Sequence, residues 1–231
     1  MSEDGAAAPR PQAPLPWGDE KPERADLIII GGITFAGLYA LAMLPLTPVL
    51  VGEHPVLLEL LRGSMTGMIT MGALSRVGDA SIVIAVLAAI PGLMLFDWLY
   101  WWAGRRWGRN AIGFFVGNHP KAAKRTAGIE RLSERWIWLV IVLCYFQPIP
   151  NPLVYAAAGW TRMKLRTFLL LDLLGSLLWI ALCVGLGYAI GQRAVDVAKG
   201  ISRYALYFTI ALIALIILRQ WWAARRRDRS G

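Results

Sequence analysis

Histidine and cysteine are scarce in this sequence, with two of each among 231 residues. Cys144 and Cys183 both lie inside apolar segments, so we expect packed thiols and not a disulfide framework. His54 and His119 are isolated, and no spacing of Cys, His and Asp resembles a metal site. The chain also has no P-loop and no nucleophile elbow. We therefore expect no cofactor and no metal, and we do not expect an enzyme.

Acidic residues are also few: 15 Asp and Glu stand against 24 Lys and Arg, for a formal charge of +9. Such an excess can indicate nucleic-acid binding. Here the basic residues flank apolar blocks and form no stripe with interleaved exposed aromatics. The pattern therefore favours the anionic cytoplasmic leaflet of a membrane as the partner, and no nucleic acid.

Long apolar blocks dominate the chain, which is 57% hydrophobic with a mean hydropathy of +0.50. A soluble domain of this size does not need so much apolar surface. We predict a membrane domain over residues 27–222, preceded by a disordered, proline-rich cytoplasmic tail (1–26) and followed by a basic cytoplasmic tail (223–231). The predicted transmembrane helices are Leu27 to Val51, Ser81 to Ala103, Thr167 to Gly191 and Tyr204 to Trp222.

Prolines interrupt the apolar segment from Trp136 to Trp160. Pro148, Pro150 and Pro152 remove backbone donors and clash with the preceding turn, so no straight helix passes through them. Lipid cannot satisfy the freed carbonyl groups, so the break must be buried in protein or line a wet cavity. The segment from Pro55 to Gly78 is too polar and too rich in glycine for a lipid-exposed helix. We predict that both segments are re-entrant broken hairpins, which in transporters point to a substrate site.

The predicted fold class is an all-α integral membrane protein, with about four transmembrane helices and two re-entrant broken hairpins. Each hairpin is followed by a full span, over Pro55 to Ala103 and again over Trp136 to Gly191, and the two halves enter from opposite sides as an inverted repeat. In this topology 19 of the 24 Lys and Arg residues share one side. The positive-inside rule then places both termini in the cytoplasm.

Two carboxylates lie inside predicted spans at similar depth. Asp97 is seven residues from Gly104, and Asp172 is six residues from Arg166, so each lies about 9–10 Å inside the cytoplasmic boundary. Intramembrane acids are costly and usually face the interior, so both are candidates for a shared polar cavity. The alternative is that Asp97 pairs with Arg105 and Asp172 with Arg162, and that each pair only fixes packing.

Two amides flank the prolines of the second hairpin. Gln147 and Asn151 can hydrogen-bond a polar headgroup at the hairpin tip, although capping of the broken backbone is an equal alternative. Further upstream, the segment from Lys121 to Trp136 has apolar residues on one face and basic residues mostly elsewhere. We expect it to lie on the anionic cytoplasmic leaflet, with a solvated charged loop as the alternative.

Several short motifs together resemble the DedA family, also called the VTT or SNARE-associated domain. The likeness covers roughly residues 30–222. It is carried by Asp97, Tyr100, Gly104-Arg-Arg-Trp-Gly108, Ala156-Ala-Ala-Gly-Trp-Thr-Arg-Met163, Phe168, Asp172, Gly175, Trp179 and Leu186-Gly-Tyr-Ala-Ile-Gly191.

The resemblance implies two opposed re-entrant hairpins and the scrambling, flipping or recycling of lipids, linked in some members to the proton motive force. The chain departs from the family at several positions. Tyr145 and Asn151 stand where the family usually has arginines, and Asp172 stands where it usually has asparagine. The first hairpin of the family usually carries a glutamate after a Pro-Gly, and here only Glu59 is close.

The leading hypothesis is a flippase-like or scramblase-like transporter of phospholipid or undecaprenyl phosphate, which could be proton-coupled. It would lie in a bacterial cytoplasmic membrane and maintain the envelope. The alternative is a non-transporting scaffold that supports envelope or division proteins, and a homo-oligomer is left open. The candidate residues for substrate or coupling are Glu59, Asp97, Arg105, Gln147, Asn151, Arg162 and Asp172, and the hairpin residues are Pro148, Pro150, Pro152 and Gly159.

Overall fold

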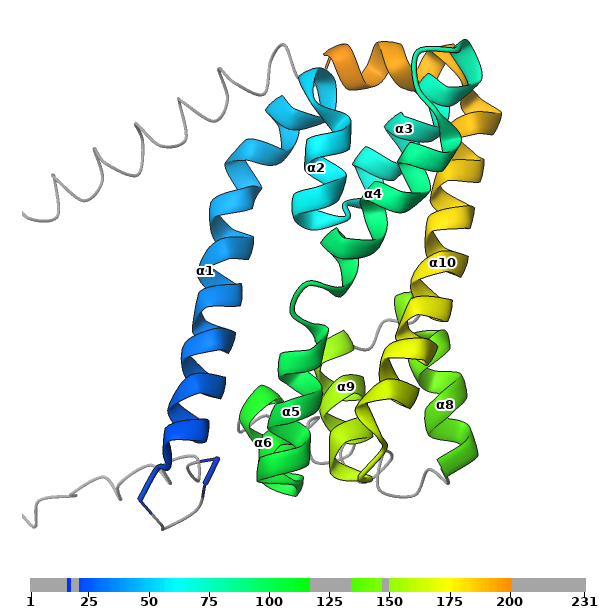
Figure 1. Ribbon diagram of the computed structural model, residues 1–231. Helices are drawn as coiled ribbons and strands as arrows, with labels where there is room; N and C mark the ends of the chain where they lie inside the picture. Colours follow the sequence, from blue (N-terminus) through cyan, green and yellow to red (C-terminus); the bar gives the residue numbers. More distant parts are fainter. Residues whose placement is uncertain (1–15, 18–20, 117–133, 147–149, 201–231) are drawn as a thin grey trace, which may run out of the picture. The chain divides into compact units, whose positions relative to one another are not determined.

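A computed structural model describes residues 16–17, 21–116, 134–146 and 150–200 (Figure 1). Every regular element in these ranges is helical, as the sequence predicts. Residues 192–200 are also helical. The elements are α1 (Arg24–Glu53), α2 (Pro55–Arg62), α3 (Met65–Val77), α4 (Ile82–Met94), α5 (Asp97–Trp107), α6 (Arg109–Val116), α8 (Glu134–Val142), a 3₁₀ turn (Cys144–Phe146), α9 (Asn151–Trp160) and α10 (Leu165–Ile190).

Three helical stretches in the described part of the chain are long and apolar enough to cross a membrane: Arg24–Glu53, Ile82–Trp107 and Leu165–Ile190. They match three of the four predicted spans. The fourth predicted span, Tyr204 to Trp222, and most of the predicted surface helix from Lys121 to Trp136 lie outside the described residues. The inverted repeat therefore stays a prediction.

Two boundaries differ from the prediction. The first helix begins at Arg24, inside the predicted tail, because Asp26 in its first turn favours a helix N-terminus. The second span is not continuous: α4 ends at Met94 and α5 begins at Asp97, and α5 extends to Trp107. Pro91 lies one turn before this break, where it removes a helical donor and crowds the preceding carbonyl.

The chain forms two compact units, and each contains one of the hairpins. The first unit spans residues 1–32 and 97–171, with α5, α6, α8 and α9. The second spans residues 33–96 and 172–231, with α2, α3 and α4. The span from Ile82 to Trp107 is thus divided between the two units. Within the second unit α2 packs on α4, and within the first unit α9 packs on α5.

In the second unit, α2 and α3 are two helices joined by a tight turn over the segment predicted as the first hairpin, and its re-entrant insertion stays a prediction. Gly63, with φ 59°, ends α2 in the left-handed region, and the Ser64 side chain caps α3 by accepting from the Gly67 N–H. Met68 and Met71 of α3 are buried with residues of α4 and α10. Gly187 of α10 lies against the Ile69 carbonyl oxygen, so these helices are in backbone contact.

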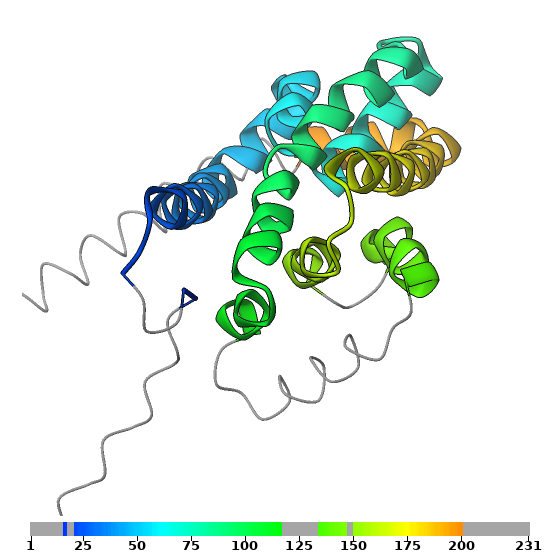
Figure 2. The same cartoon turned by 60° about the horizontal axis from the view of Figure 1, so that its bottom comes forward.

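In the first unit, α9 lies between α5 and α8 (Figure 2). Its N-terminus fits the prolines: Pro150 precedes the first residue and Pro152 occupies the first turn, where no intrahelical donor is lost. Ile137 and Ile141 of α8 share a buried cluster with Tyr155 of α9. The predicted second hairpin is therefore helical on both sides of its break.

Candidate functional site

Glu59 is a fully buried carboxyl group in the first hairpin. Neither of its carboxyl oxygens has a hydrogen-bond partner among the described residues. Burying a carboxyl group without a partner is costly, and such groups inside membrane domains are candidates for function. Of the acids named from the sequence, Glu59 is the one that the described structure leaves without a hydrogen-bonding partner.

The turn of the hairpin fixes where this carboxyl group lies. The Gly63 N–H donates to the Glu59 carbonyl oxygen over 2.9 Å, and Gly92 of α4 packs against the same carbonyl. The side chain lies at the first turn of α3, where a β-carbon on Gly67 would overlap Glu59 Oε1. Glycine at these positions therefore provides the space that Glu59 occupies.

Asp97 is the first residue of α5 and directly follows the break in the span. Its exposed fraction is 9%. Trp101 lies one turn further on the same face, and its indole N–H is buried with no hydrogen-bond acceptor among the described residues. The Trp101 ring stacks on Phe168, with 6.4 Å between centroids. From the sequence, Trp98, Trp101 and Trp102 are expected to form an aromatic belt near the cytoplasmic boundary in preference to a ligand box, and this stays a prediction.

Asp172 is fully buried in α10. Its carbonyl oxygen accepts a 2.8 Å hydrogen bond from the buried Ser176 hydroxyl one turn later. Asp97 belongs to the first unit and Asp172 to the second. The shared cavity that the sequence suggests for these two acids therefore stays a prediction.

The remaining sequence candidates are distributed around the second hairpin. Asn151 is half-buried at the start of α9, whereas Gln147 and Pro148 lie outside the described residues. Arg105 and Arg162 are exposed, and Arg162 has a φ of 60° in the turn after α9. Gly159 has a packing role, because a β-carbon there would overlap the Trp101 carbonyl oxygen.

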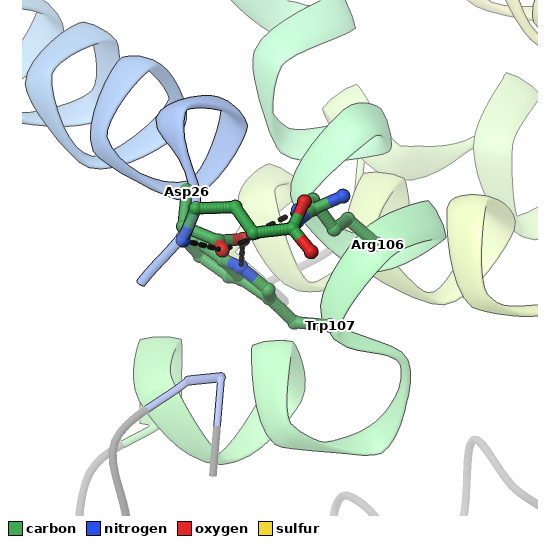
Figure 3. Close-up of polar contacts among 4 residues, drawn as sticks. Asp26, Arg106 and Trp107 are labelled. Atoms are coloured by element: carbon green, nitrogen blue, oxygen red, sulfur yellow. Dashed lines mark hydrogen bonds and ion pairs between the residues drawn. The ribbon is translucent and has the colours of Figure 1, made fainter. Parts of the chain in front are cut away.

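The first unit also contains an ion cluster that the sequence analysis did not find (Figure 3). Arg106 Nε and Trp107 Nε1 donate to Asp26 Oδ1 over 2.5 and 2.8 Å. A terminal nitrogen of Arg106 also bonds Glu23 Oε2 at 2.5 Å. The cluster ties the first turn of α1 to the last turn of α5. Its members are about 80 residues apart, and no local pattern predicts that pairing.

Among the described residues, no group of three or more His, Cys, Asp or Glu side chains could hold a metal ion. Cys144 and Cys183 are buried and are not joined in a disulfide, so both are packed thiols, as predicted.

Comparisons with known proteins find a family and several relatives. The family model of the VTT domain matches residues 63–189. Inner membrane protein YabI of Escherichia coli is 26% identical over 86% of this chain and 76% of its own length. Undecaprenyl phosphate transporter A of Staphylococcus aureus is 22% identical over 63% of this chain and 72% of its own. An alkaline phosphatase-like protein of Lactococcus lactis is 26% identical over 64% and 71%. No solved structure matches.

Proposed function

Because this chain belongs to the DedA family of VTT-domain membrane proteins, we propose that it is a lipid transporter. The substrate would be a phospholipid or undecaprenyl phosphate, moved by a flippase-like or scramblase-like mechanism. Relatives from Staphylococcus aureus and Bacillus subtilis that carry the name undecaprenyl phosphate transporter A, at 22% and 23% identity, support a lipid phosphate as the substrate class.

The observation that carries the proposal is the buried carboxyl group of Glu59 at the first hairpin. A group that costs stability at such a place is retained for function in membrane proteins more often than for packing. In the proposed mechanism Glu59 takes up and releases a proton as the hairpin changes its surroundings, which couples lipid movement to the proton gradient. Such a coupling needs no nucleotide, in agreement with a sequence that has no P-loop.

The headgroup would be received by the polar residues that the sequence singles out in the spans and at the second hairpin. Asp97, Asn151 and Asp172 are the proposed lining, with Gln147 at the second hairpin tip. Half-helices whose broken ends meet a substrate at mid-membrane are a recurring design of secondary transporters. The proposed location is a bacterial cytoplasmic membrane, with both termini inside as the distribution of Lys and Arg predicts.

The test is lipid translocation by the purified full chain in proteoliposomes. Fluorescent phospholipid and labelled undecaprenyl phosphate would be assayed separately, with protein-free liposomes as the control. We expect movement of at least one lipid above the control rate. If protein shown to be folded by circular dichroism moves neither lipid, the proposal is wrong and the scaffold alternative replaces it.

A further inference from the structure

The second unit contains an apolar groove of about 410 Å³. It lies between the C-terminal part of α1, the first turns of α3 and the end of α10, and it continues onto helical residues 192–200. Figure 1 shows the helices that carry these residues. Its walls include Val51, Ile69 and Ile190. A volume of this size is within the range of small-molecule sites.

Threonine hydroxyls in the wall do not make this groove polar. The Thr70 hydroxyl donates to the Thr66 carbonyl oxygen over 2.9 Å, and the Thr47 hydroxyl donates to the Met43 carbonyl oxygen over 2.7 Å. Their donor hydrogens are thus used by the backbone of their own helices. The groove therefore suits a hydrocarbon chain better than a polar ligand.

Arg193 is the charged residue of the lining. Gly191, with φ 63°, ends α10 in the left-handed region, and Arg193 follows two residues later as an exposed side chain. No carboxylate of the described residues lies within ion-pairing distance of it. The nearby Asp196 accepts instead from Gln192. A guanidinium group with no acidic partner is a good ligand for a phosphate, which it can bind through two parallel hydrogen bonds.

A second cation adjoins the same groove. Arg62, at the end of α2, donates from a terminal nitrogen to the hydroxyl oxygen of the groove-lining Thr47 over 2.9 Å. Arg62 is half-buried and likewise has no acidic partner within ion-pairing distance among the described residues. Two positive charges therefore lie beside an otherwise apolar groove. This arrangement matches an anionic amphiphile, which has a negative headgroup and an apolar chain.

From this combination we propose that the groove holds one anionic lipid, with a hydrocarbon chain along Ile69 and Ile190 and its phosphate on Arg193. Because α1 and α10 are spans, the groove opens where bilayer lipids are the available hydrocarbon. The acyl chain of a lipid gains little free energy by moving from the bilayer to another apolar surface. The contact between the lipid headgroup and Arg193 must therefore supply the selectivity for an anionic lipid. A lipid held here need not be the one that is moved, and the site is independent of the proposed transport.

The test measures lipid retention by the purified full chain in detergent, using native mass spectrometry. The probes are phosphatidylglycerol and phosphatidylcholine with the same acyl chains. We expect one phosphatidylglycerol to be retained in preference to phosphatidylcholine. Arg193→Gln should reduce that preference by roughly tenfold or more, because the amide has no charge and cannot make two parallel hydrogen bonds to a phosphate.

Lys199→Gln is the matched control, because Lys199 is an exposed cation on the same helical segment that does not line the groove. It should leave the preference unchanged. Equal retention of the two lipids by the wild-type chain, or equal losses in the two variants, would overturn the proposal.

The contact between the lipid's acyl chain and the groove is tested separately. A phosphatidylglycerol with a photoreactive group in its acyl chain should label peptides that contain Ile69 or Ile190. Ala194→Leu, which fills the groove wall, should reduce both the labelling and the retention of lipid. Gly185→Leu places the same leucine side chain on α10 at an open position and should reduce neither. Labelling unaffected by Ala194→Leu in folded protein would contradict the proposed groove.

Discussion

Gly104 of α5 lies directly against the carbonyl oxygen of Ala156 in α9, so that a β-carbon at residue 104 would overlap that oxygen. Three residues later on α9, Gly159 makes the same kind of contact with the Trp101 carbonyl oxygen of α5. The two glycines, one on each helix, bring the backbones together where side chains would hold them apart. This contact joins the second hairpin to the helix that carries Asp97.

We predict that Gly104→Ala destabilises the protein by about 1–3 kcal/mol, the usual cost of overpacking. Gly31→Ala is the matched control, since nothing lies within 4 Å of a β-carbon there. In a helix interior that change should stabilise by about 0.5–1 kcal/mol. Thermal unfolding in detergent, followed by circular dichroism, measures both. A Gly104→Ala protein as stable as Gly31→Ala would show that α5 and α9 are not in backbone contact.

We predict that Gly63→Ala destabilises the first hairpin more than Gly78→Ala does. Both glycines have positive φ, 59° and 86°, so both variants lose about 1–2 kcal/mol from the left-handed conformation. At Gly63 a β-carbon would also meet the Leu93 amide nitrogen at 2.6 Å, whereas Gly78 has open space. The difference between their unfolding midpoints therefore isolates the packing of α2 on α4, and equal midpoints would contradict it.

Much of this fold could be predicted from local patterns. Hydropathy alone predicts the three long spans, because each is an apolar run with few charges. Pro150 and Pro152 alone predict the break before α9, because a proline lacks the backbone donor and disfavours a helical conformation in the residue before it. The break between Met94 and Asp97 was missed. A single proline such as Pro91 kinks many helices without ending them, and the surrounding residues are as apolar as those of an intact span.

Part of the candidate site could likewise be predicted from the sequence, and part could not. Glu59 could be named from the sequence because it is the acid closest to the position where the family's first hairpin usually carries a glutamate. Its burial without a hydrogen-bond partner among the described residues could not be predicted, because Gly67 of α3 and Gly92 of α4 come against Glu59 only in the folded unit. Asp26 and Arg106 are 80 positions apart, and each alone has the pattern of a solvated charge at a helix end.

We predict that Asp26→Asn lowers the thermal midpoint clearly, whereas Glu23→Gln has little effect. Asp26 is buried, and one of its oxygens accepts from both Arg106 and Trp107, so removal of the charge weakens two hydrogen bonds. The Glu23 side chain is 73% exposed, and water replaces its contact with Arg106. Unfolding of the two variants in the same detergent provides the comparison. Equal shifts would mean that the cluster is a surface contact and does not anchor α1.

We predict that Glu59→Gln keeps or raises stability while it abolishes pH-dependent lipid movement. The amide removes the cost of burying a group that can ionise, and it occupies the same space beside Gly67, so the hairpin should remain folded. It cannot exchange a proton, so any transport that remains should no longer vary with pH.

Glu53→Gln, at the exposed end of α1, is the matched control and should keep the wild-type pH profile. Both variants would be assayed in proteoliposomes from about pH 5 to about pH 8, on both sides of neutrality. A stable Glu59→Gln protein with a wild-type rate and pH profile would exclude Glu59 from coupling. A stable variant without activity would separate the function of this carboxyl group from any part in folding, because the loss could not then be assigned to a damaged hairpin.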